Sequence, residues 1–162
     1  MNEFSREINA LIVCILSGVL LSAMFVEFYY RQAPCPLCLI QRLGMIGIAS
    51  GELLNLRFGI RMRHYALSYL SMVIGIGASI QHIILHICPG GKPVGFTVFG
   101  FSLYVWSFIV FVCAFLGMTL LLFCYKPKKK LEIPKKIGVF PLFAFILIAL
   151  ITFVNIFTTL AL

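Results

Sequence analysis

Charged side chains are scarce in this sequence: they make up 11% of its 162 residues, and only five of them are acidic. An average soluble domain is about 25% charged and roughly 45–50% apolar, whereas this chain is 62% hydrophobic with a mean hydropathy of +1.08. A small soluble domain buries too little of its area to hide so much apolar surface. The composition therefore excludes a water-soluble enzyme, a disordered chain and a nucleic-acid-binding domain, and it predicts an integral membrane protein.

Five long apolar runs predict five transmembrane helices, because a helix needs roughly 20 apolar residues to cross the hydrocarbon core. The alternating ten-residue pattern of a membrane β-barrel is missing. The runs cover about residues 8–30, 39–56, 65–87, 100–124 and 137–162. We expect an all-α integral membrane protein: an antiparallel four-helix bundle core (1–125), a basic cytoplasmic loop (126–136) and an additional C-terminal transmembrane helix (137–162).

Small residues in the second and third runs predict that these two helices pack closely, because helices in a membrane approach through residues without bulky side chains. These residues are Gly44, Gly47, Gly51, Gly75, Gly77 and Ala78. The first run is too long for the apolar region of a signal peptide, so we expect it to be retained.

The basic residues predict an orientation. Ten of the thirteen Lys and Arg residues lie before the first run, between the second and third, or between the fourth and fifth. By the positive-inside rule this side is cytoplasmic. The N-terminus is then inside, and the loop with Cys35 and Cys38 is outside, where thiol oxidation is favoured. The lysine-rich segment 126–136 has no aromatic residue to stack on bases, so we interpret it as a topology signal rather than a nucleic-acid site.

The strongest local motif is Cys35-Pro36-Leu37-Cys38, at the start of the second run. Two cysteines three positions apart can close a small disulfide ring and open it again. We expect Cys38 in the first helical turn, where the partial positive charge of the helix N-terminus stabilises a thiolate. Arg42 lies one turn later on the same face and adds a full positive charge. The motif therefore predicts a redox-active thiol pair.

Three other interpretations compete with the redox one. A structural disulfide with so small a ring would constrain little chain. Two cysteines used only for packing do not fit a proline-flanked position at the membrane interface. A zinc site needs about four ligands. The metal-binding alternative would therefore use the set Cys35, Cys38, His82, His86 and Cys88.

Two motifs give a resemblance to a known family. Cys35-x-Leu37-Cys38-x-x-Gln41-Arg42, placed after the first span, resembles the DsbB family of bacterial membrane disulfide oxidoreductases. The segment Phe99-Gly100-Phe101-Ser102-Leu103, followed by Trp106-Ser107, resembles that family's opening of the fourth span. His82, near the outer end of the third span, also resembles a residue of that family. The resemblance covers the first four spans, about residues 20–115.

The resemblance implies a quinone-dependent thiol oxidase of the bacterial inner membrane that supports disulfide formation in exported proteins. The Cys35–Cys38 disulfide would accept two electrons from a periplasmic DsbA-like thioredoxin-fold protein and pass them to ubiquinone or menaquinone. Cys35 would be the sulfur attacked, and Cys38 the leaving thiolate. Arg42 and His82 would line the quinone site, with Arg42 bonded to a quinone carbonyl. The alternative for Arg42 is an arginine that snorkels to the interface.

The sequence also departs from the family. Typical members carry a second cysteine pair in a long outer loop, whereas here the loop is short and holds Cys88 alone. Cys88 either forms a transient bond in the relay or is a bystander. The alternative enzyme, an outward electron-transfer thiol reductase, would need Cys14 and Cys113 to face each other in the membrane. The fifth span is expected to be an extra anchor.

Several other residues are expected to have structural roles. Glu27 is expected to pair with Arg31 at i+4. Gln41 is expected only to flank the cysteine motif. Tyr104 and Trp106 are expected to belong to the aromatic belt at the membrane interface.

Overall fold

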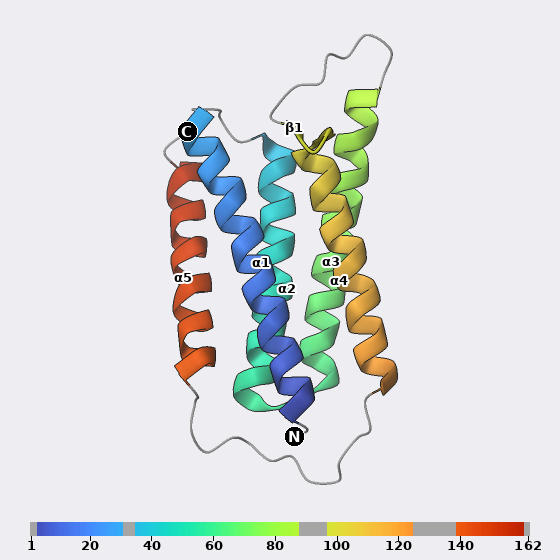
Figure 1. Cartoon of the computed structure of the whole chain (residues 1–162), viewed down its shortest axis with the longest axis vertical. Helices are drawn as coiled ribbons and strands as arrows, with labels where there is room; N and C mark the ends of the chain where they lie inside the picture. Colours follow the sequence, from blue (N-terminus) through green and yellow to red (C-terminus); the bar gives the residue numbers. More distant parts are fainter. Residues whose placement is uncertain (1–2, 31–34, 88–96, 125–138, 161–162) are drawn as a thin grey trace.

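The chain forms a bundle of antiparallel helices (Figure 1). The computed structural model describes residues 3–30, 35–87, 97–124 and 139–160, so that Cys88 and the basic segment 126–136 lie outside the described residues. Successive helices run in alternating directions along the long axis. The elements are α1 (Glu3–Tyr30), α2 (Pro36–Phe58), α3 (Met62–Ile87), β1 (Thr97–Val98), β2 (Phe101–Ser102), α4 (Leu103–Cys124) and α5 (Val139–Leu160).

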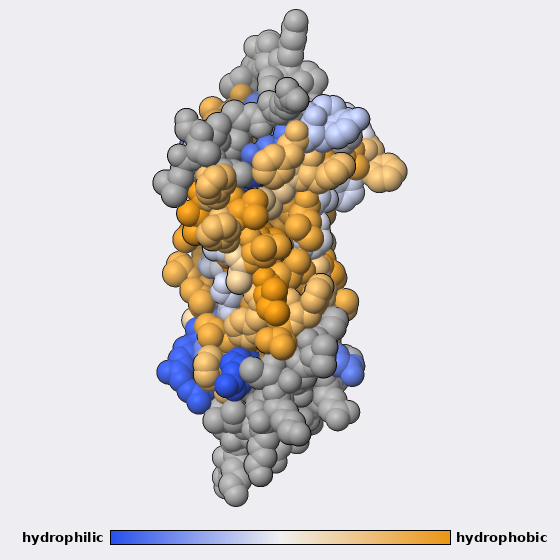
Figure 2. Space-filling model, turned by 90° about the vertical axis from the view of Figure 1, so that its left-hand side faces the viewer, coloured by the Kyte–Doolittle hydropathy of each residue, from blue (hydrophilic) through white to orange (hydrophobic). Residues whose placement is uncertain are grey.

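Four helices, α1 to α4, are long and apolar enough to cross a membrane. Helix α5 contains the apolar stretch Leu142–Phe157, and its 22 residues extend about 33 Å at 1.5 Å per residue. It packs against α1 and α2. Figure 2 shows a largely hydrophobic surface between the two ends of the molecule. The predicted fold class, a four-helix membrane bundle with a fifth helix, is therefore confirmed.

Among the described helices, α2 and α3 share the most extensive contact, and glycine makes their close approach possible. A β-carbon on Gly44 would lie 3.2 Å from the Cα atom of Gly75, and one on Gly51 would lie 2.8 Å from the carbonyl oxygen of His64. A β-carbon on Gly47 would meet the side chain of Ser71. The predicted close packing is confirmed for these four glycines. It is wrong for Gly77, whose β-carbon would meet nothing within 4 Å.

Polar side chains join the same two helices at the end of the bundle away from the cysteines. Glu52 is fully buried, and its Oε1 atom accepts a hydrogen bond from Ser68 Oγ at 3.2 Å. Asn55 Oδ1 accepts from the backbone N–H of Arg61 at 3.3 Å and lies 3.0 Å from His64 Nδ1. Such interhelical hydrogen bonds contribute to helix association where water is excluded. They fix the tight connection between α2 and α3.

A small hairpin precedes α4. Val98 pairs with Phe101 in an antiparallel register, and the turn residues Phe99 and Gly100 both have positive φ, 50° and 81°. Positive φ at both central residues is typical of the tight turns that join twisted strands. Trp106 Nε1 donates a hydrogen bond to the carbonyl oxygen of Val98 at 3.0 Å. The predicted start of the fourth helix near residue 100 is therefore wrong, because the chain is still in the hairpin there and α4 begins at Leu103.

Helix α4 packs against α3 through apolar side chains and a polar contact. The hydroxyl of Tyr69 on α3 lies 3.0 Å from Thr119 Oγ1 on α4, and its ring packs edge-on against Phe115. Fully or almost fully buried side chains form the core of the bundle: Val13, Leu16, Leu20, Ile48, Ala49, Met72, Phe111, Met118, Ala144 and Ile151. Every helix contributes to this core.

The glycine contact between α2 and α3 gives a first testable prediction. We expect Gly51→Ala to lower the free energy of unfolding by about 1–3 kcal/mol, because the new methyl group overpacks against the backbone of α3. Thermal unfolding in detergent micelles, followed by helical circular dichroism, measures the effect. Gly77→Ala is the matched control, and it should be neutral or stabilising by up to about 1 kcal/mol since its surroundings are open. Equal stabilities of the two variants would contradict the assignment of Gly51 to a packing contact.

Candidate active site

The start of α2 holds both cysteines of the motif. Pro36 occupies the first helical turn, where its missing N–H costs no hydrogen bond, and Cys35 caps the helix in an extended conformation. The backbone N–H of Cys38 donates to Cys35 Sγ at 3.1 Å. Both residues are free thiols and half-buried. Cys38 lies in the first turn of the helix, as predicted.

His82 on α3 reaches the thiol pair from the side. Its ring is buried, and Nε2 lies 3.9 Å from Cys35 Sγ. The two sulfur atoms and one ring nitrogen of His82 all lie within 4.8 Å of one another. An imidazole at this distance from a thiol is able to take up or return a proton as the sulfur changes its state. The fold therefore brings together three of the four residues predicted for the site.

Gln41 and Tyr104 also contact His82. Gln41 is buried, and its Nε2 atom lies 3.5 Å from His82 Nδ1, so it does more than flank the motif. The ring of Tyr104 on α4 lies 4.7 Å from the imidazole of His82, centroid to centroid, and 5.0 Å from that of His86. Tyr104 therefore packs over the two histidines rather than serving only as a belt residue.

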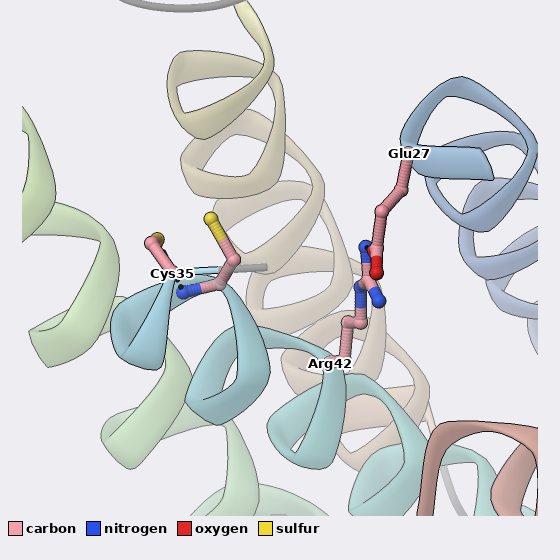
Figure 3. Close-up of polar contacts among 4 residues, drawn as sticks. Glu27, Cys35 and Arg42 are labelled. Atoms are coloured by element: carbon pink, nitrogen blue, oxygen red, sulfur yellow. Dashed lines mark hydrogen bonds and ion pairs between the residues drawn. The ribbon is translucent and has the colours of Figure 1, made fainter. Parts of the chain in front are cut away.

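Arg42, the fourth predicted site residue, forms an ion pair with Glu27 on α1 (Figure 3). The two side chains are 10% and 12% exposed, so the pair is largely withdrawn from the surface. The expected partner of Glu27, Arg31, lies outside the described residues; among the described ones the partner is Arg42. An arginine held by a carboxylate inside the bundle differs from one that snorkels to the interface.

The ion pair with Glu27 uses one terminal nitrogen of the Arg42 guanidinium. The guanidinium bonds to Glu27 through Nη2, whereas Nη1 is buried and has no acceptor among the residues that the structure describes. A buried donor of a charged group is costly to leave without a partner. Arg42 can therefore bind one acceptor atom of a ligand while it remains paired with Glu27.

The Glu27–Arg42 and Gln41–His82 contacts do not follow from local sequence spacing. Glu27 and Arg42 are 15 positions apart, and Gln41 and His82 are 41 apart, so no helical spacing relates them. A weaker signal was available for the ion pair, because charged residues within apolar runs require partners in the membrane.

The metal-binding alternative is supported only for part of its ligand set. Cys35, Cys38 and His82 gather their ligand atoms, whereas His86 Nδ1 lies 2.9 Å from the carbonyl oxygen of His82 and must donate to it. Cys88 lies outside the described residues.

The two membrane cysteines that the outward-reductase alternative requires lie on different helices. Cys14 is half-buried on α1, and Cys113 is exposed on α4. Among the described residues, neither of the two forms a disulfide.

Comparison with known proteins identifies relatives of this chain. It is similar to disulfide bond formation protein B of Cupriavidus pinatubonensis, with 34% identity over 90 residues that cover 55% of this chain and 56% of the relative. The homologous protein of Cupriavidus necator is 32% identical over the same coverage. That of Xanthomonas euvesicatoria is 30% identical over 78 residues, 45% of each chain. The chain thus matches about half the length of these relatives. No solved structure matches significantly.

The family model for disulfide bond formation protein DsbB matches residues 5–94, which is more than half of the chain. The matched region covers nearly all of α1 and the whole of α2 and α3, but it ends before the hairpin. It includes all four predicted site residues: Cys35, Cys38, Arg42 and His82. This multi-pass helical membrane protein therefore belongs to the DsbB family.

Proposed function

We propose that this protein is a membrane thiol oxidase that transfers oxidising equivalents from a quinone, through Cys35 and Cys38, to a soluble periplasmic DsbA-like thioredoxin-fold protein. The observation that carries the proposal is the pair of cysteine sulfurs at the N-terminus of α2 with His82 Nε2 3.9 Å from one of them. Family membership and the membrane-spanning helices support it. Exported proteins would receive their disulfides from the soluble partner, and the membrane in question is the bacterial inner membrane.

The thiol exchange needs two nucleophilic displacements. A thiolate of the reduced partner attacks Cys35 Sγ, and the Cys35–Cys38 bond breaks with Cys38 leaving as a thiolate. The second thiolate of the partner then attacks the partner sulfur that is bonded to Cys35 in the mixed disulfide. This releases the oxidised partner and leaves Cys35 as a thiolate. The pair has then gained two electrons, and two protons from the partner's thiols complete the balance. Cys35 is the site of attack because it caps α2, whereas Cys38 lies inside the helix.

His82 serves this exchange as a proton carrier. Its Nε2 atom faces Cys35 Sγ, while Nδ1 faces the amide of Gln41. A hydrogen bond at one ring nitrogen fixes the orientation and the tautomer of a histidine. Gln41 and the ring of Tyr104 therefore act as positioning groups that keep Nε2 directed at the thiols.

The residues around Arg42 fit a quinone. The donor that this group needs is present, since Nη1 of Arg42 is buried and lacks an acceptor within the described part of the chain. A quinone carbonyl is an uncharged acceptor that a lipid-soluble ligand brings through the membrane, and the ion pair with Glu27 keeps the guanidinium fixed and its charge balanced. A bound quinone supplies the acceptor for the two electrons and two protons that leave the reduced pair. Arg42 would orient it, with Glu27 as a positioning residue.

The cysteine pair gives the decisive test. Cys35→Ser and Cys38→Ser should each abolish quinone reduction driven by a reduced thioredoxin-fold partner, because neither variant can form the exchanging disulfide. The absorbance of the quinone reports turnover of the purified protein in the presence of a chelator. When mixed with the oxidised partner instead, Cys38→Ser should form a mixed disulfide that is visible on a non-reducing gel, because the Cys35 thiolate opens the partner's disulfide and one partner thiolate leaves. Cys14→Ser, which alters a thiol on α1, should keep wild-type turnover. Full activity in either motif variant would refute the proposal.

The role of Arg42 is tested by varying the quinone concentration. Arg42→Ala should raise the KM for quinone by about tenfold or more, since a hydrogen bond from a charged donor contributes about 1.5–3 kcal/mol. Arg57→Ala, at the opposite end of α2, is the control and should leave this KM unchanged. An unchanged KM in Arg42→Ala would exclude Arg42 from the quinone site.

A further inference from the structure

We propose that reduced Cys35 and Cys38, together with His82, form a binding site for a thiophilic divalent cation of the zinc type, and that this site exists only in the dithiol state. The binding itself does not depend on the proposed function. Only its consequence does: a bound cation would hold the pair reduced and thereby inhibit the thiol oxidase.

The distances between the three donor atoms suit such a cation. They all lie within 4.8 Å of one another, and Cys35 Sγ is 3.9 Å from His82 Nε2. With Zn–S near 2.3 Å and Zn–N near 2.0 Å, tetrahedral angles place two sulfurs about 3.8 Å apart and a sulfur and a nitrogen about 3.5 Å apart. The donors therefore need to close by at most about 1.3 Å, which side-chain rotation supplies. Three protein ligands leave a fourth position for water.

The histidine is already oriented as a metal ligand. Its Nε2 atom faces the sulfurs, and Nδ1 lies 3.5 Å from the side-chain amide of Gln41. Metal-bound histidines usually donate their other ring N–H to a nearby oxygen, which fixes the ring. Turning the Gln41 amide by half a turn presents its oxygen to Nδ1, and the two amide orientations are not distinguished by shape.

The charges of the site balance when the cation is bound. Two thiols lose their protons to become thiolate ligands, so a divalent cation with two thiolates and a neutral imidazole carries no net charge. The neighbouring ion pair between Arg42 and Glu27 is also neutral as a unit. Desolvation of such a neutral complex in a partly buried site costs little free energy, whereas desolvation of an unbalanced charge there would cost much more. Thiolate ligands favour zinc and similar soft ions over magnesium or calcium.

The redox state of the pair controls the site. When Cys35 and Cys38 are joined by a disulfide, neither sulfur is a thiolate, and two of the three ligands are lost. The oxidised protein should therefore not bind the cation. Conversely, a bound cation occupies both sulfurs and prevents the disulfide from forming again.

Zinc titration of the full-length protein in detergent tests the site. Zn²⁺ is titrated into chelator-washed protein in competition with a chromophoric chelator, in the reduced and in the oxidised state. We expect one ion per reduced chain and none per oxidised chain. His82→Ala should weaken binding to the reduced protein by about tenfold or more. His86→Ala, one turn further along α3, is the matched control and should bind like the wild type. With Cd²⁺ as the probe, sulfur-to-metal charge-transfer absorption should appear in the wild type and be lost in Cys38→Ser.

Equal zinc binding by reduced and oxidised wild type would overturn the inference, and this comparison needs no variant to fold. Unchanged affinity in His82→Ala would overturn the ligand set. The two proposals fail separately. A protein that oxidises its partner in the presence of a chelator but binds no zinc refutes the metal site alone. A protein that binds zinc only when reduced but never oxidises a dithiol protein refutes the proposed function alone.

Discussion

The close approach of α2 and α3 is the contact on which the site depends. Glycines at the interface let the backbones meet, with Gly44 facing Gly75 and Gly51 facing the carbonyl of His64. Because the two helices are antiparallel, the start of α2 lies beside the end of α3. Cys35 and His82 therefore come within contact distance although 47 positions separate them. A bulkier interface would move the imidazole away from the thiols even if every site residue were kept.

Helix α2 joins two different chemical environments. Its N-terminus presents the thiols toward α3 and His82, and one turn later Arg42 extends toward α1, as Figure 3 shows for Cys35, Arg42 and Glu27. Thiol exchange needs access to a soluble protein, whereas a lipid-soluble acceptor is bound best by buried donors. A single helix that carries both groups on neighbouring turns keeps the two within a short distance. The carboxylate of Glu27 keeps the second environment free of net charge.

Much of the fold follows from local sequence. Apolar runs predict the membrane helices, and the position of the cysteine motif at the start of the second run predicts that Cys38 lies in the first turn, because both depend on neighbouring residues alone. The start of α4 was missed because it depends on positive φ at Phe99, a conformation that few non-glycine residues adopt. The partners of Glu27 and Gln41 were missed because tertiary packing decides them. The catalytic roles of Cys35, Cys38, Arg42 and His82 stay predictions, because the structure gives the positions of these side chains and a role in catalysis is defined by a reaction.

The hairpin before α4 sets the rotation of that helix about its own axis. Strand β2 ends at Ser102 and the helix begins at the next residue, while the indole of Trp106 is bonded back to Val98. No residue separates the strand from the helix, so α4 cannot rotate about its axis independently of the hairpin. Each residue of an α-helix advances by about 100°, so one residue inserted at this junction would turn Tyr104 away from the histidine ring that it covers. The angular position of α4 is thus specified by two hydrogen-bonded dipeptides rather than by its nearly uniform apolar surface.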